Sequence, residues 1–434
     1  YLYHRGNDEL RAHLLNYVQQ KYPHLVVRLG EAELVGNEGI RIRQLSLTKP
    51  ESDQSQATQL IYAEEINILC DPNLQDLVQG KLTIKSVQIN GLISDIVREV
   101  DGRWNVETLM PSTSKMNLPK LPEVVVRGGV VQYTDRSLPT HPVLFKELDL
   151  RLQLKALRNR QQQSTGNISA QLDGTVSTDF CRQIAIKGSA NSSEKSWVMS
   201  GEILEVKWSQ ALIDVLPVEI PSDFIEDLQT EAQIKFSAAQ RPGQSTPQFR
   251  VDGVVNRGQW HPPRLHQPMT NLRANFKVDN RGVAIQQLSA TLGAGKIQTE
   301  FHLNGFNLEQ PYALSMTATQ FPITPRLIEA LPESLQETWR KYRPIGTVSG
   351  RLQITHDGRE TEHDAEFTSQ DLSLLHYKHQ YPVTDCRGTA RLYNGLFDFH
   401  LDGLAGRTPI TIKGSLRNPG PLATGWCEVR TSGW

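Results

Sequence analysis

A strict alternation of apolar and polar side chains dominates this sequence. From Leu148 to Lys155 every even-numbered residue is leucine, and every odd-numbered residue is polar or charged. The same alternation runs through 272–278, 296–303 and 409–413. Successive side chains of a β-strand point to opposite faces, so each of these segments has one apolar and one polar side. The pattern predicts a mostly β protein with antiparallel strands and one apolar face, and not the buried parallel sheet of an α/β enzyme.

Turn signals and a few helical patterns separate the strands. Asp279–Gly282 and Asn394-Gly395 predict hairpin turns, because Asn and Gly tolerate positive φ. Helical spacing of apolar residues predicts a helix over 7–22, and capping signals predict short helices over about 209–216 and 325–342. These helices are too few to cover an extended sheet.

Composition and charge exclude several classes of protein. The 434 residues include 46 basic and 47 acidic side chains, which is not the basic footprint of a nucleic-acid-binding protein. Four cysteines are too few for a disulfide scaffold. No apolar run approaches the ~18 residues that a membrane span needs, and the first residues lack the pattern of a signal peptide. We therefore expect a fragment or a processed product.

The sequence repeats itself at a long interval. Leu212–Pro217 reappears as Leu327–Pro332, 115 positions later, and each copy stands between strand-like segments. A unit of roughly 110–115 residues that recurs in this way predicts stacked modules with one continuous apolar surface. The best candidate for a join is 111–122. The predicted parts are then an N-terminal part and three modules, namely 1–122, 123–250, 251–365 and 366–434.

No motif predicts catalysis or a bound cofactor. The nearest histidine pairs, His376 with His379 and His261 with His266, lack cysteines or clustered carboxylates at the spacing of zinc ligands. The four cysteines are isolated in the sequence, which predicts buried thiols or one disulfide and gives no sign of a nucleophilic Cys–His pair. We predict no catalytic residues, no metal and no cofactor.

Several segments resemble the AsmA family. The segment Leu77–Gly91, followed by Ile96–Leu109 with its Gly-Arg-Trp-Asn string, is similar to the N-terminal signature of that family. Gly39–Leu47 resembles the strand after the family's leading helix, and Arg127–Asp135 resembles its next strand pair. The region 252–355 is similar to AsmA-like C-terminal regions, so that the resemblance covers most of the chain.

The resemblance implies a function that the residues alone do not. AsmA-like proteins resemble the chorein-type bridge-like lipid transfer proteins, whose long curved β-sheet forms an apolar channel for phospholipid between membranes. An N-terminal transmembrane helix holds the family in the inner membrane, and the body lies in the periplasm. For this chain the resemblance implies a periplasmic protein that supports outer-membrane biogenesis and is anchored by a segment upstream of Tyr1. Its implied partners are phospholipid or another acyl lipid, the inner and outer membranes and other envelope proteins, and no nucleic acid.

We therefore expect a long twisted antiparallel sheet, curled into an open apolar groove of repeat modules, with an N-terminal helix. Burial of each CH₂ group of an acyl chain in such a groove contributes about 0.8 kcal/mol. The residues predicted to line the groove are the apolar members of the alternation. They are Leu150, Leu152, Leu154, Leu272, Phe276, Val278, Ile285, Ile297, Phe301, Leu314, Met316, Leu352, Ile354, Phe397, Phe399, Leu401, Ile410 and Ile412.

Two other classes stay open at this point. Facing sheets would turn the same apolar sides into the closed core of a structural β-repeat scaffold or interaction protein. An enzyme would need a cleft with convergent polar groups, and no such group of residues stands out in the sequence. The helix over 7–22 likewise has two interpretations, as a plug at one end of the sheet or as a linker near a membrane.

Overall fold

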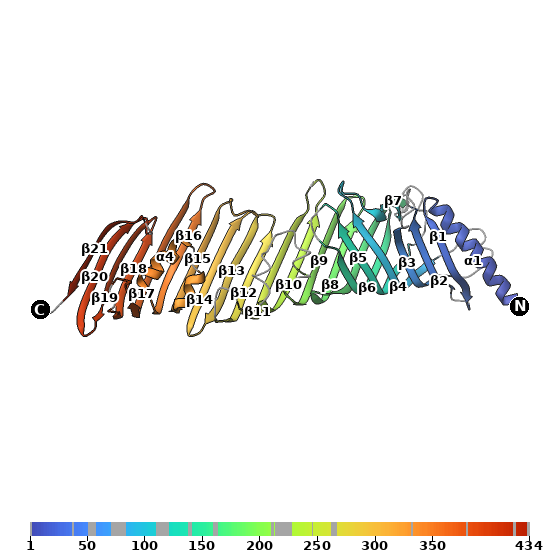
Figure 1. The fold of residues 1–434 in the computed structure, drawn as a ribbon. Helices are drawn as coiled ribbons and strands as arrows, with labels where there is room; N and C mark the ends of the chain where they lie inside the picture. The colour runs from blue at the N-terminus through green and yellow to red at the C-terminus, as the bar shows by residue number, and fades with distance from the viewer. Residues whose placement is uncertain are drawn as a thin grey trace. The chain divides into compact units, whose positions relative to one another are not determined.

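The computed structural model describes residues 2–36, 39–50, 58–70, 84–109, 121–137, 141–158, 164–209, 212, 228–244, 246–261, 267–330, 333–378, 381–419 and 422–431. Most of the described residues lie in strands, so the fold is mostly β, as the alternation predicts. Hydrogen bonds join these strands into one 21-stranded sheet that does not close on itself (Figure 1). The prediction of an open, mostly β fold with few helices is confirmed.

The chain divides into two compact units. Unit 1 comprises Tyr1–Glu219 and Lys235–Phe249, and unit 2 comprises Ile220–Ile234 and Arg250–Trp434. Two strands contribute residues to both units, namely β10 (Leu228–Gln240) and β11 (Gln248–Trp260).

Unit 1 begins with a helix and continues with strands that pair in sequence order. The helix is α1 (Leu2–Lys21), and a short 3₁₀ helix, η1 (Asn105–Leu109), follows the fourth strand. The strands are β1 (Val26–Val35), β2 (Gly39–Lys49), β3 (Thr58–Cys70), β4 (Ile84–Arg98), β5 (Glu123–Asp135), β6 (Val143–Arg158), β7 (Ser164–Thr178), β8 (Cys181–Asn191) and β9 (Ser196–Val206). Each pairs antiparallel with the next, except for β4 and β5.

The β4–β5 pair runs parallel, with Ser86 opposite Glu123 and Arg98 opposite Asp135. The expectation of a wholly antiparallel sheet is wrong at this pair. Side-chain alternation is the same whichever way a strand runs, so the pattern carries no information on direction. Parallel neighbours need a crossover of a dozen or more residues, and 99–122 has that length.

The helix α1 packs on the apolar face of β1–β3. Leu10 is buried in a cluster with Leu29 and Ile42, and Val18 packs against a second cluster that contains Val27 and Leu47. The predicted helix over 7–22 is confirmed and begins five residues earlier, at Leu2. It closes the apolar face at its β1 end, which is the plug interpretation.

The Gly-Arg-Trp-Asn string, which follows β4, contacts both β4 and β5. The Asn105 side-chain amide donates to the Asp95 carbonyl at 2.7 Å, and its oxygen accepts from the Val97 backbone N–H at 2.8 Å. Trp104 stacks on Tyr133, with ring centroids 5.9 Å apart. The part of the sequence that resembles the AsmA signature therefore holds a structural joint in this chain.

A buried carboxylate completes this joint. Asp135 is 5% exposed and accepts hydrogen bonds from the Ser137 hydroxyl at 2.6 Å, the Ser137 backbone N–H at 2.9 Å, and Arg98 and Tyr133 at 3.1 Å each. Donors on a carboxylate favour its charged form. The hydrogen bonds from Ser137, aided by those from Arg98 and Tyr133, outweigh the effect of burial and lower the pKa of Asp135 to about 2.

This pKa predicts a loss of stability in acid. Because the folded-state pKa lies below the ordinary value of 3.8, the Asp135 contribution is present above that pH and is lost as the pH falls through about 2. Denaturant unfolding between pH 5 and about 2 is expected to show wild type losing its advantage over Asp135→Asn across that window. Asp173→Asn, at an exposed carboxylate on β7, is the control. Parallel stability curves for wild type and Asp135→Asn would contradict this role.

Unit 2 continues the antiparallel order. Its further strands are β12 (Met269–Asp279), β13 (Gly282–Leu292), β14 (Gly295–Asn304), β15 (Tyr312–Ile323), β16 (Gly346–His356), β17 (Thr361–Leu374), β18 (Val383–Tyr393), β19 (Leu396–Ala405), β20 (Thr408–Arg417) and β21 (Thr424–Thr431). From β11 to β21 each strand pairs antiparallel with the next. Both predicted hairpin turns are confirmed, with Asp279 opposite Gly282 and Tyr393 opposite Leu396.

The helix predicted over 325–342 is two elements, η4 (Pro325–Ala330) and α4 (Glu333–Tyr342). Residues 331–332, between the two elements, lie outside the described residues. Of the predicted helix over 209–216 the structure describes Ser209 and Leu212 only. Most of the predicted join at 111–122, and most of the repeated Leu212–Pro217 segment, lie outside the described residues. The four predicted modules stay a prediction.

Candidate functional site: the apolar face of the sheet

The strand register of unit 2 brings predicted lining residues into one row. Phe276 pairs with Ile285, Ile285 with Phe301, Phe301 with Leu314, and Leu314 with Ile354. Residues that are directly opposite on neighbouring strands share a face of the sheet. This row therefore crosses five strands, β12 to β16, on a single face.

A second row continues on the same face to β20. Met316 pairs with Leu352, and Leu352 connects through Ala365 and Leu392 to Phe397. The other predicted residues of unit 2 share this face because they pair with these residues or stand an even number of positions along a strand. They are Leu272, Val278, Ile297, Phe399, Leu401, Ile410 and Ile412. We call this surface the apolar face of unit 2.

Side chains on this apolar face are partly accessible. All eighteen predicted lining residues are partly buried, and none of them is either fully buried or fully exposed. Some of their neighbours on the opposite face are exposed, as Ser315 and Thr317 are on either side of Met316. Others, such as Asn275 and Lys277 beside Phe276, are partly buried. The core of a closed sandwich shuts such residues off from solvent on both sides. In the described part of unit 2, no protein layer seals the predicted lining residues in that way.

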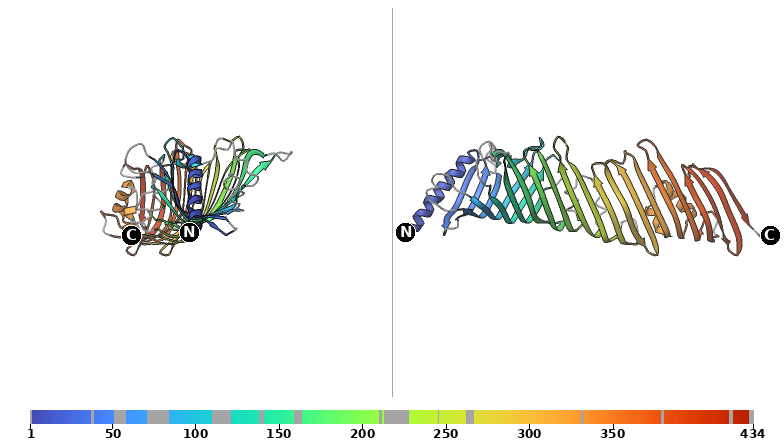
Figure 2. Two further views of the ribbon diagram at one scale, coloured as in Figure 1. Left: turned by 90° about the vertical axis from the view of Figure 1, so that its right-hand side faces the viewer. Right: turned by 180° about the vertical axis from the view of Figure 1, so that it is seen from behind.

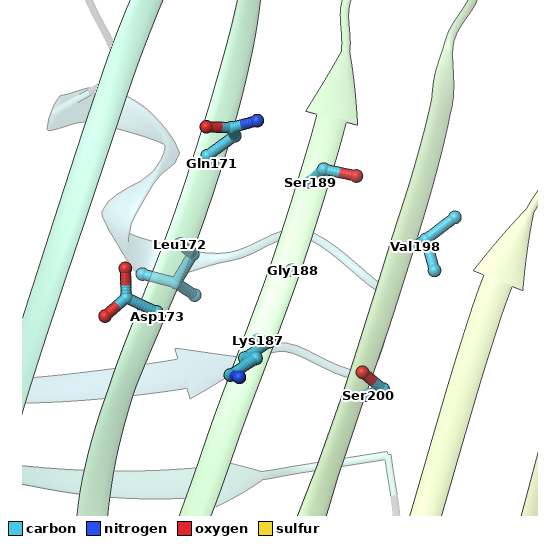
Figure 3. Close-up of a pocket in the computed structure, with 8 residues that line it drawn as sticks. All are labelled: Gln171, Leu172, Asp173, Lys187, Gly188, Ser189, Val198 and Ser200. Atoms are coloured by element: carbon cyan, nitrogen blue, oxygen red, sulfur yellow. The ribbon is translucent and has the colours of Figure 1, made fainter.

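Unit 1 differs, because part of its apolar face packs on itself. Val126, Leu148, Val176 and Ile184 are buried in one cluster that also receives side chains of β4 and β9. The sheet of this unit curls, so that strands from earlier in the chain lie behind β7–β9 (Figures 2 and 3). Of the predicted lining residues here, Leu150 packs against this cluster. The sequence alone did not predict this closure.

Phenylalanine rings on the apolar face of unit 2 lie over glycines of the neighbouring strand. Phe276 pairs with Gly253, and Phe399 pairs with Gly414. A Cβ atom at either glycine would overlap the facing ring. Because glycine has no side chain, the phenylalanine ring can lie close to the backbone of the neighbouring strand. The ring fills the space that a side chain would otherwise occupy.

The alternation of apolar and polar side chains does not predict these ring–glycine contacts, because a glycine contributes no side chain to the pattern. An isolated glycine inside a strand pattern signals a close approach by another group, and Gly253 and Gly414 both stand inside such patterns. That signal marks the glycine but does not identify the ring that covers it, since the partner depends on the register.

Gly253→Ala is expected to destabilise unit 2 by about 1–3 kcal/mol, the usual cost of overpacking. In Phe276→Leu the ring is absent, so the same substitution should cost much less, and a double-mutant cycle of denaturant unfolding measures the difference. Val254→Ile adds one carbon at the adjacent, exposed position and is the matched control. Equal costs of Gly253→Ala in both backgrounds would contradict the ring–glycine contact.

The opposite face carries polar side chains and ion pairs. In unit 1, Arg41 pairs with Glu33 at 3.0 Å, and Arg43 pairs with Glu31 at 3.3 Å and with Glu65 at 3.5 Å. Exposed pairs of this kind each contribute at most about 1 kcal/mol, so this face is a solvated surface rather than a source of stability.

A shallow depression of about 520 Å³ lies on this polar face, over β7–β9 (Figure 3). Its lining includes Gln171, Asp173, Lys187 and Ser200. Asp173 and Lys187 are exposed, so the depression lacks the desolvation that tunes catalytic groups. Within the described residues, no group of three or more His, Cys, Asp or Glu side chains is arranged to hold a metal ion.

The cysteines differ in accessibility. Cys70, Cys181 and Cys386 are buried, whereas Cys427 on β21 is exposed. Burial raises the pKa of the Cys386 thiol to about 11. The Cys427 residue is exposed, but partial desolvation of its sulfur also raises the pKa of its thiol. Because Cys181, Cys386 and Cys427 are thiols, the alternative of a disulfide among these three is wrong.

Thiol labelling tests this arrangement. Maleimide is expected to add once to the native chain, at Cys427, and four times in denaturant, with the adducts counted by intact-mass spectrometry. Cys427→Ser should remove the native adduct alone. Rapid labelling of Cys386 in the native protein would contradict its burial.

Comparisons with known proteins add no relative. No family model, curated protein or solved structure matches this chain. None of the described helices is both long enough and apolar enough to cross a membrane. The resemblance to the AsmA family stays a prediction from sequence strings.

Proposed function

We propose that this chain is a non-catalytic lipid-binding and lipid-transfer protein that holds acyl chains on its apolar face. The observation that carries the proposal is the pair of residue rows across β12–β20, which are apolar and continuous in register, and whose members other than Ala365 are only partly buried. A hydrocarbon tail that lies on that surface would shield it from water, and burial of apolar surface contributes a favourable free energy of about 25 cal/mol per Å².

The backbone supports the same proposal. In a sheet the ladder hydrogen bonds satisfy the N–H and C=O groups of interior strands, so the face presents side chains to a ligand. Acyl chains need no polar partner, and the predicted lining residues are all apolar, so none of them would hold one lipid more tightly than the next by a polar contact. Such a surface favours movement of lipid along the sheet over storage at one point.

The biological setting of the proposal is a bacterial envelope. The resemblance to AsmA-like sequences supports a periplasmic protein, anchored to the inner membrane by a segment upstream of this chain, that carries phospholipid between the two membranes for outer-membrane biogenesis. Other envelope proteins are its candidate partners.

A second candidate is a structural β-repeat scaffold. The observation that favours it is the buried cluster of unit 1, where Val126, Val176 and Ile184 form a closed core. Native mass spectrometry of gently purified protein separates the two functions. Co-purified phospholipid supports lipid transfer, and a lipid-free particle supports the scaffold.

A charge on the apolar face is expected to abolish lipid binding there. In Phe276→Asp a carboxylate replaces the ring at the β12 end of the first row, and an unpaired charge against hydrocarbon costs several kcal/mol. We expect the variant to lose most of its co-purified lipid and its transfer of fluorescent phospholipid between vesicles.

Asn275→Asp is the matched control, because it places the same charge one residue away on the opposite face. It should bind and transfer lipid as wild type does. Circular dichroism and thermal unfolding verify that both variants fold. A folded Phe276→Asp protein with wild-type lipid transfer would overturn the proposed function.

A further inference from the structure

The end of α4 and the segment after β17 are hydrogen-bonded to each other, next to the start of β16 and the end of β17. The Leu375 backbone N–H donates to the Tyr342 carbonyl at 2.9 Å, and the Tyr377 N–H donates to the Lys341 carbonyl at 2.8 Å. Ile345 forms a β-bridge with Ser373. Two segments that are thirty residues apart therefore form one surface, next to the start of β16 and the end of β17.

This surface exposes large rings next to cations. Its members are Tyr342, Arg343, Ile345, Tyr377, Lys378 and Tyr381, which we call the tyrosine–basic patch. Tyr381 is 80% exposed and Tyr377 is 53% exposed. The His376 ring lies 5.2 Å from Tyr342 and 4.8 Å from Tyr377, and the Lys378 ammonium lies 5.5 Å from the Tyr377 ring centre.

Local structure does not account for the whole patch. Basic residues in the last turn of α4 offset the helix dipole, and this explains Arg340 and Lys341. It does not explain Tyr377, Lys378 and Tyr381, which lie outside the helix. Exposed aromatic groups that gather in one place mark a surface for binding.

The members of the patch carry two basic side chains, Arg343 and Lys378, and no acidic one. The nearest carboxylate of β17 is that of Asp371, which accepts a hydrogen bond from the Thr347 hydroxyl at 2.7 Å. Tyrosine presents an apolar ring and a polar hydroxyl, a combination that is enriched where headgroups meet acyl chains. Each Lys or Arg close to an anionic bilayer contributes about 1 kcal/mol to binding.

We propose that the tyrosine–basic patch docks on the headgroup surface of an anionic lipid bilayer. The cations would meet phosphate groups, and the tyrosine rings would lie at the level of the glycerol backbone. Docking of this patch would bring the adjacent ends of β16–β18 toward the bilayer. The inference adds a membrane contact to the proposed function and does not require lipid on the apolar face.

Vesicle flotation of the full chain tests the proposal. Wild type is expected to float with phosphatidylcholine vesicles that contain phosphatidylglycerol, to bind pure phosphatidylcholine weakly, and to dissociate at high salt. Tyr377→Ser/Lys378→Glu should weaken binding to the anionic vesicles by at least about tenfold, since it reverses one charge and removes one ring.

A matched control exists at the opposite end of β18. Tyr393 is 50% exposed and lies 5.6 Å from the Arg391 guanidinium, so it resembles the Tyr377–Lys378 pair chemically. Arg391 is ion-paired with Asp364, so the charge is reversed at exposed Arg417, which is opposite Leu396, the partner of Tyr393. Tyr393→Ser/Arg417→Glu therefore makes the same two kinds of change at this end and should leave binding unchanged. Arg343→Glu is a second patch substitution, in case the first perturbs folding.

The outcomes separate this inference from the proposed function. Wild type that ignores anionic vesicles, or patch and control variants that lose binding equally, would overturn the docking proposal. Capture of a protein partner without vesicle binding would overturn it as well and would assign the patch to a protein interface. Phe276→Asp should still float, so loss of lipid from the apolar face and loss of docking can be told apart.

Discussion

Strand register is the constraint on which the rest of this structure depends. A slip of one residue between neighbouring strands would turn every apolar side chain to the opposite face. Because one face of each strand is apolar, the hydrophobic effect holds the register, and the register in turn makes rows such as Phe276, Ile285, Phe301 and Leu314. Hairpins with short turns fix it further, as at Asn394 and Gly395, which both have positive φ.

The alternation is not perfect, and its interruptions have a structural role. Asn271, Gln320 and Asp385 adopt left-handed φ values near 50° next to register shifts in β12, β15 and β18. An extra residue at such a β-bulge moves the apolar positions by one, and it also increases the local twist. These three bulges, one each on β12, β15 and β18, help to keep the apolar residues on one face while the sheet twists.

These features explain what the sequence could and could not predict. The strands that contain Leu272, Phe301 and Ile412 were predictable because alternation with a period of two is a local property of the chain. Three other features were not predictable. The direction of β5 and the ring over Gly253 depend on a neighbouring strand. The bulge at Asn271 depends on a backbone angle that several residue types adopt. The closed cluster of unit 1 was not predictable either, because its apolar residues alternate with polar ones just as those of unit 2 do.

The difference between the two units bears on how an open apolar face can exist. An uncovered row of leucine and phenylalanine side chains invites aggregation. In unit 1, α1 and the curling of the sheet reduce that exposure. In unit 2 the side chains stay partly buried without such a cover. Rings such as Phe276 and Phe399 lie close to a facing glycine, and large side chains on neighbouring strands, about 4.8 Å apart, partly shield one another from water. The apolar face is thereby partly shielded from water, and under the proposed function a lipid tail that lies on it would complete the burial that neighbouring strands begin.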